Sequence, residues 1–169
     1  MKRLLGALIV VIMLLTALTS CGLDVPKPEI KSAEFDFSVT YEIDGVQNTV
    51  SGVYVCEYKG LGWALDGGYY RDWDGYVKDN TVEEIIVLCQ VEEFATLDLH
   101  LGFYPDYLMN DPSLYWDRTC APYLSVCYDD EEGLSFDSDA DRIYEQYNAR
   151  IVSFYYEEPI KNSFSPTNF

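Results

Sequence analysis

Basic residues are scarce in this chain, which has 11 Lys and Arg against 29 Asp and Glu and a formal net charge of −18. Affinity for nucleic acids depends on Lys and Arg side chains that neutralise phosphates. Anionic lipid headgroups also repel an acidic surface. We therefore expect no nucleic-acid partner. We interpret the acidic surface as a source of solubility, with attraction of cations or a basic partner as the alternative.

Catalytic motifs are missing too. His100 is the only histidine, so a Ser-His-Asp or Cys-His mechanism would have to use it. It falls on the polar side of a predicted strand, and the chain has no G-x-S-x-G nucleophile motif. We expect a structural or surface role for His100, no catalytic residues and no enzymatic activity. The alternative is a small surface hydrolase that uses paired carboxylates and needs no histidine.

The spacings typical of structural zinc and calcium sites are absent. No two cysteines have the short C-x₂₋₄-C spacing of zinc sites. Asp137, Asp139 and Asp141 begin like an EF-hand loop, but Arg142 stands where that loop needs Gly. We expect no metal and no cofactor, and we assign these carboxylates to the capping of a helix.

Four cysteines lie outside the first 21 residues: Cys56, Cys89, Cys120 and Cys127. An even number permits two disulfides in a secreted protein, with three connectivities that sequence alone does not distinguish. The alternative is that these residues act as small buried hydrophobic side chains.

The only long apolar run comes at the start of the chain, from Leu4 to Leu18, after the basic residues Lys2 and Arg3. A basic start, a run of this length and small residues at its end are typical of a secretion signal. A permanent membrane helix needs about 20 apolar residues, so this run is short for one.

The end of this run, Leu18-Thr19-Ser20-Cys21, resembles the lipobox of bacterial lipoproteins. The resemblance covers residues 1–21 only. It implies that residues 1–20 are a signal peptide, that cleavage falls between Ser20 and Cys21, and that Cys21 carries a diacylglycerol. It also implies a lipid-anchored protein on the extracytoplasmic face of a cell membrane, with the lipid on Cys21 as its membrane contact. Residues 21–32, with two prolines, are predicted to form the lipidated cysteine and a tether.

The remaining chain predicts one mainly β domain over residues 33–160 and a tail over 161–169. Residues 34–43 alternate strictly between apolar and polar, and Asp44-Gly45 follows as a turn. Further strands are expected at 49–58, 63–65, 69–77, 84–91 (a central strand), 94–103, 122–128 and 150–156, with one helix at about 139–148. This order favours an antiparallel β-sandwich or a curved sheet with one helix in the C-terminal half.

The most unusual local segment is residues 67–76, GGYYRDWDGY. Aromatic side chains beside carboxylates suit a carbohydrate or peptide groove. We expect ligand contacts from Tyr69, Tyr70, Asp72, Trp73, Asp74 and Tyr76. The alternative is a β-hairpin with aromatic cross-strand pairs.

Together these features predict a membrane-anchored, non-catalytic binding module with a protein or carbohydrate partner. A structural protein of the cell envelope is the further alternative.

Overall fold

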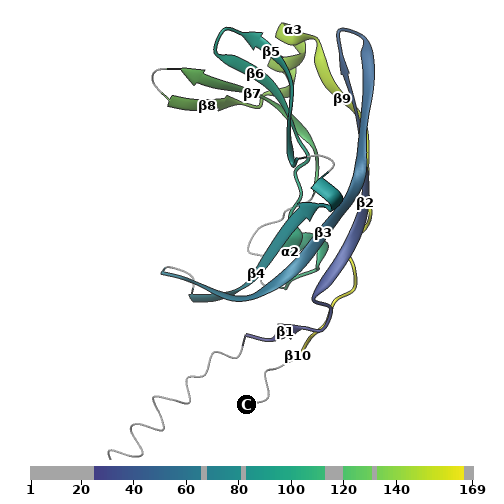
Figure 1. Ribbon diagram of the computed structural model, residues 1–169, viewed down its shortest axis with the longest axis vertical. Coiled ribbons are helices and arrows are strands. Elements are labelled where there is room, and N and C mark those ends of the chain that lie inside the picture. The colour runs from purple at the N-terminus through teal and green to yellow at the C-terminus, as the bar shows by residue number, and fades with distance from the viewer. Residues whose placement is uncertain (1–24, 66–67, 81–82, 113–119, 131–132, 166–169) are drawn as a thin grey trace, which may run out of the picture.

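The computed structural model describes residues 25–65, 68–80, 83–112, 120–130 and 133–165. It is mainly β and antiparallel, with a strongly curved sheet and one regular helix in the C-terminal half, so the predicted fold class is confirmed. One sheet has the strand order β4-β3-β2-β9 and the other the order β5-β6-β7-β8 (Figure 1). The predicted signal peptide (residues 1–20) and the predicted lipidation site Cys21 lie outside the described residues.

The curved sheet consists of β2 (Ser32–Ile43), β3 (Val46–Ala64), β4 (Gly68–Val77) and β9 (Ala149–Tyr156). The second sheet consists of β5 (Ile85–Glu92), β6 (Ala95–His100), β7 (Tyr123–Asp130) and β8 (Gly133–Asp137). Short elements complete the fold: β1 (Lys27–Pro28), β10 (Phe164–Ser165), a 3₁₀ turn (Lys78–Asn80) and α2 (Pro105–Leu108). No helix of the described residues is long and apolar enough to cross a membrane.

The β2–β3 hairpin forms as its sequence predicts. Phe35, Phe37 and Val39 are buried, and the side chains between them are more exposed. Asp44 and Gly45 have φ values of 52° and 78°, as a tight turn with two left-handed residues requires. Alternation therefore gives this strand one face in the core and one toward solvent.

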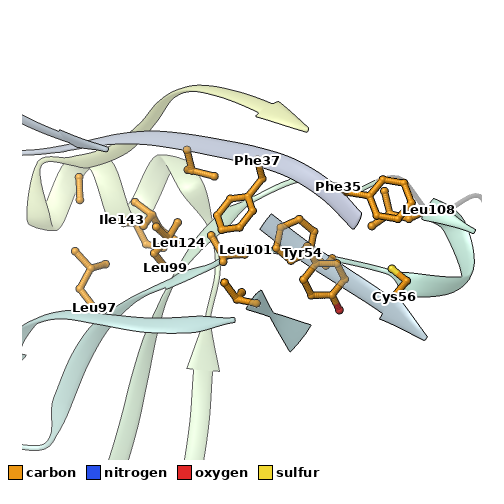
Figure 2. Close-up of a cluster of buried hydrophobic side chains, with 14 of the residues drawn as sticks. Phe35, Phe37, Tyr54, Cys56, Leu97, Leu99, Leu101, Leu108, Leu124 and Ile143 are labelled. Atoms are coloured by element: carbon orange, nitrogen blue, oxygen red, sulfur yellow. The ribbon is translucent and has the colours of Figure 1, made fainter. Parts of the chain in front are cut away.

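The core lies between the two sheets (Figure 2). Phe35, Phe37 and Tyr54 of the curved sheet belong to one buried cluster with Leu99 and Leu101 of the second sheet and its continuation. The Tyr54 ring stacks on Phe103, with ring centroids 4.0 Å apart. At about 25 cal/mol per Å² of apolar surface removed from water, this cluster is the main source of stability.

The regular helix α3 (Ala140–Tyr147) begins where capping predicts. Asp139 is the N-cap, and its Oδ1 accepts hydrogen bonds from the backbone N–H groups of Asp141 and Arg142 at 3.1 Å. Asp137 bonds the Arg142 side chain at 2.9 Å. The assignment of the Asp-rich segment to helix capping is therefore confirmed, and Ile143 seats the helix in the core.

Two segments differ from expectation. The strand expected to be central, 84–91, becomes β5 at the edge of the second sheet. Apolar residues lie on both of its faces, which is typical of a central strand, but one of these faces remains open to solvent. Lys27–Pro28 and Phe164–Ser165, expected in a tether and a tail, pair with each other as an antiparallel ladder. This ladder joins the two ends of the described chain to the domain.

Candidate functional site

The aromatic segment 69–76 lies on β4, an edge strand, and strand alternation divides it between two faces. Tyr70, Asp72, Asp74 and Tyr76 lie on one face, and Tyr69 and Trp73 lie on the other. A single ligand therefore cannot contact all six residues from one side.

Cross-strand pairs occupy the side of β4 that carries Tyr70 and Tyr76. The Tyr76 hydroxyl donates to Glu57 at 3.2 Å, and Asp74 forms an ion pair with Lys59 at 3.6 Å. The Tyr70 ring covers Gly62, where a Cβ atom would lie 2.4 Å from its Cζ. These contacts join β4 to β3 as in a hairpin, whereas the aromatic residues that oppose each other, Tyr58 with Trp73 and Trp63 with Tyr69, lie on the other face.

The opposite side of β4 holds a buried ion pair that the sequence did not indicate. Arg71 donates to both carboxylate oxygens of Asp111 at 2.6 and 2.5 Å, and the two side chains are only 4% and 1% exposed. Trp73 Nε1 donates to the same carboxylate at 2.8 Å. Arg71 also donates to the Pro26 carbonyl at 3.0 Å and lies over the Phe164 ring. All of these groups have partners, so the cluster ties the hairpin to the chain ends.

The four cysteines are free thiols in the structure. Cys56 is fully buried, and burial raises the pKa of its thiol to about 12. Burial also raises the pKa of Cys120 to about 11. Cys89 lies opposite Leu97 and Cys127 lies opposite the next residue, Thr96, so these two thiols project from opposite faces of their sheet and cannot bond to each other.

The second sheet leaves one broad face open to solvent, and we name this surface the open face. Register places Ile85, His100 and Tyr123 side by side across it, with Val87, Asp98 and Ser125 as the next row. Further along, Phe136 lies opposite Cys127 and Leu134 opposite Asp129. Five large side chains on this face are between 44% and 66% exposed: Ile85, Val87, Tyr123, Leu134 and Phe136. An exposed apolar surface of this kind marks interaction sites in soluble domains.

A polar group lies beneath these apolar side chains. Asp98 is 6% exposed and Ser125 is 1% exposed. His100 Nε2 and the Ser125 hydroxyl are 2.8 Å apart, and the imidazole stacks on the Tyr123 ring with centroids 4.4 Å apart. Burial lowers the pKa of His100, and the charge of Asp98 opposes part of this effect.

Asp98 stands apart from its neighbours, because its buried Oδ1 has no hydrogen-bond partner among the described residues. A buried polar atom without a partner costs free energy, so each such atom needs an explanation. A donor supplied from outside would remove this cost, but because this oxygen is itself buried, the side chains that cover it must first move aside.

The contact between Ser125 and His100 has the geometry of a nucleophile and its base. The Ser125 hydroxyl is buried, however, so in this conformation a substrate carbonyl has no access to it. No group of three metal-ligating side chains occurs in the described parts of the chain. The arrangement is therefore best suited to binding a hydrogen-bond donor at Asp98 within an apolar surround.

Among the described residues, three surface pockets have volumes of about 280 to 350 Å³, and neither Asp98 nor His100 lines any of the three. The most apolar of the three lies between β7, α3 and β9, where Leu124, Ile143 and Ile151 line it.

Sequence reasoning placed His100 on the polar side of its strand but did not join it to Ser125. Asp98 and His100 are two residues apart, so alternation already puts them on one face. The position of Ser125 depends on the pairing of β6 with β7.

No protein-family model, curated protein or solved structure matches this chain.

Proposed function

We propose that the protein is a lipid-anchored, extracytoplasmic, non-catalytic binding module whose contact surface is the open face. The anchor rests on the lipobox-like segment that ends at Cys21. The observation that carries the binding role is Asp98, a buried carboxylate with an unpartnered oxygen among exposed apolar side chains. Binding sites commonly combine an apolar surface with a few polar groups that fix orientation.

The partner is a protein segment that presents apolar side chains and one Lys or Arg. The open face spans strands of a whole sheet and its apolar side chains remain substantially exposed, which suits a broad partner surface better than a small molecule. A Lys or Arg supplies the donor that Asp98 Oδ1 needs. The net charge of −18 attracts such a basic segment and opposes a second copy of the chain.

A short peptide that alternates Val and Lys is a direct probe of this surface. Calorimetric titration measures its affinity, and amide NMR shifts show where it binds. We expect shifts on β5, β6, β7 and β8, and little binding of the matched Val and Glu peptide. Asp98→Asn should lower the affinity for the Val-Lys peptide by at least about 10-fold, because the buried Lys of the peptide then loses its negatively charged partner.

Asp129→Asn is the matched control, because it removes the same charge from an exposed position of the same face. Equal effects of the two substitutions would mean that only overall charge matters, which contradicts the proposal. Shifts confined to other elements also contradict it. Shifts that grow with protein concentration in the absence of peptide would identify a second copy as the occupant instead.

A further inference from the structure

The point where the chain enters the domain is fixed by a buried contact. Arg71 donates to the Pro26 carbonyl at 3.0 Å, and Asp111 holds the Arg71 guanidinium through two hydrogen bonds. Pro28, two residues later, is buried and belongs to the β1–β10 ladder. Pro26 is thus held against β4.

Covalent geometry then limits where the anchor lies. Four residues lie between Cys21 and Pro26. An extended chain spans at most about 3.6 Å per residue step, so the five steps from Cys21 to Pro26 span at most about 18 Å. If Cys21 carries the lipid, as the proposed function requires, the bilayer surface lies within about this distance of Pro26. The part of the domain around Pro26 and Arg71, on the β3–β4 hairpin, therefore lies toward the membrane.

This end of the β3–β4 hairpin carries exposed apolar and aromatic side chains. Register places Leu61 opposite Arg71 and Trp63 opposite Tyr69, so these side chains share one face. Trp63 is 57% exposed, Tyr69 is 41% exposed, and Leu65 beyond them is 91% exposed. We name Leu61, Trp63, Leu65 and Tyr69 the hairpin end.

The hairpin end and the β1–β10 ladder lie at the same end of the long axis of the molecule, and the second sheet lies at the other (Figure 1). From these positions we propose that the hairpin end inserts into the interface of the bilayer that holds Cys21. The hairpin end is then a second membrane contact beside the lipid.

The chemistry of the hairpin end fits the headgroup region. Trp and Tyr prefer this region because they combine an apolar ring with a polar group. Leu65 adds apolar surface, worth about 25 cal/mol per Å² removed from water. The lipid raises the local concentration of bilayer around the hairpin end, so a contact too weak to act alone becomes occupied.

The acidic side chains of β4 project away from this contact, because of the alternation of the strand. Asp72 and Asp74 project from the strand face opposite Tyr69. Glu57 lies on the same side as Asp74, where Lys59 pairs with it at 2.6 Å. The contact is therefore apolar, and it should depend little on salt or on anionic lipid.

The test uses the lipidated protein reconstituted into phosphatidylcholine vesicles, with brominated phosphatidylcholine as a quencher of tryptophan emission. We expect strong quenching and a blue-shifted emission in the wild-type protein. Trp63→Phe should remove most of the quenching, because Trp63 is the tryptophan assigned to the bilayer. Neither an added anionic lipid nor salt should abolish the effect.

Two matched pairs of variants sharpen the result. Leu65→Asp should reduce the quenching of Trp63, whereas Leu134→Asp, which adds the same charge at an exposed position of the second sheet, should not. A new tryptophan at the far end, Phe136→Trp in the Trp63→Phe background, should report no quenching.

Mass spectrometry of the Cys21 peptide separates the two proposals. Lipid on Cys21 together with unquenched Trp63 overturns the membrane contact and leaves the anchor in place. Absence of lipid on Cys21 overturns the anchor, and the hairpin inference with it. A Trp63 emission shift that depends on protein concentration without vesicles would assign this surface to a second copy and overturn the membrane contact.

Discussion

Two buried polar clusters of this protein differ in whether their groups have partners. Arg71 and Asp111 are almost fully buried, but each satisfies the other, and Trp73 and Pro26 complete the cluster. A buried charge is costly unless it is paired, so this cluster has a structural explanation. Asp98 is buried to a similar degree, and one of its oxygens has no hydrogen-bond partner in the part of the chain that the structure describes. That contrast is why the binding role is assigned to Asp98.

His100 predicts a pH dependence of stability. Burial lowers the pKa of the folded imidazole below its ordinary value of 6.5, so the unfolded chain binds more protons between the two values. This contribution to stability is fully present above about pH 6.5 and is lost as the pH falls through the lowered pKa. The midpoint of urea unfolding should decrease between pH 7 and pH 5 in the wild-type protein and decrease less in His100→Gln.

Two hydrogen-bonded carboxylates titrate below this range, because hydrogen bonds, and for Glu57 also the charge of Lys59, lower the pKa values of Glu29 and Glu57 from 4.5. Their contributions are lost only at lower pH. Parallel curves for the wild-type protein and His100→Gln over this range would contradict the prediction.

At the scale of elements, the end of β6 depends on one glycine. Gly102 has φ of 64°, and a Cβ atom there would lie 2.0 Å from the Ala121 carbonyl oxygen. This close approach brings the segment before β7 against the segment after β6. It therefore supports the pairing of β6 with β7 that assembles the open face.

Substitution of this glycine has a matched control in the β2–β3 turn. Gly45 also has a positive φ, of 78°, but a Cβ atom there would meet nothing within 4 Å. Gly45→Ala should lower the free energy of unfolding by about 1–2 kcal/mol from the strained backbone conformation alone. Gly102→Ala should cost at least about 2 kcal/mol more, because a backbone atom must also move. Denaturant unfolding measures both, and equal losses would refute this account of Gly102.

At the scale of the whole molecule, the two proposed surfaces lie at opposite ends of the long axis (Figure 1). The hairpin end and the β1–β10 ladder share one end, and the open face belongs to the other. A binding face directed away from the proposed bilayer contact remains accessible to partners. The bond from Arg71 to Pro26 and the β1–β10 ladder fix the residues from which the proposed anchor segment extends.

Cys21→Ala should release most of the protein from the membrane fraction. Each buried lipid CH₂ contributes about 0.8 kcal/mol, so the diacylglycerol outweighs the hairpin end as an attachment. Separation of membrane and soluble fractions, with a radioactive fatty-acid label, measures the release. Cys127→Ala serves as the control, because it removes a thiol from the domain and should leave membrane retention unchanged. Unchanged membrane retention of Cys21→Ala, with no label on the wild-type protein, would refute the anchor.

The sequence by itself determined the elements whose cause is local. Alternation in residues 34–43, the Asp44-Gly45 turn and capping of the helix by the Asp-rich segment each depend on neighbouring residues, and each occurs as predicted, with Asp139 as the residue that caps. Alternation also separates Tyr69 and Trp73 from Tyr70 and Tyr76. The six residues of segment 69–76 that we expect to contact a ligand therefore lie on two faces of the strand, a separation that the alternation of the sequence already contains.

Only the tertiary structure decided which residues meet across the sheets. Ser125 reaches His100 through the pairing of β6 with β7, and Arg71 reaches Asp111 and Pro26, 40 and 45 residues away in the chain. The edge position of β5 was decided in the same way. Backbone propensities and turns act over a few residues, whereas strand order, register and the burial of Asp98 depend on packing between distant segments. The open face and the hairpin end became visible only once that packing was known.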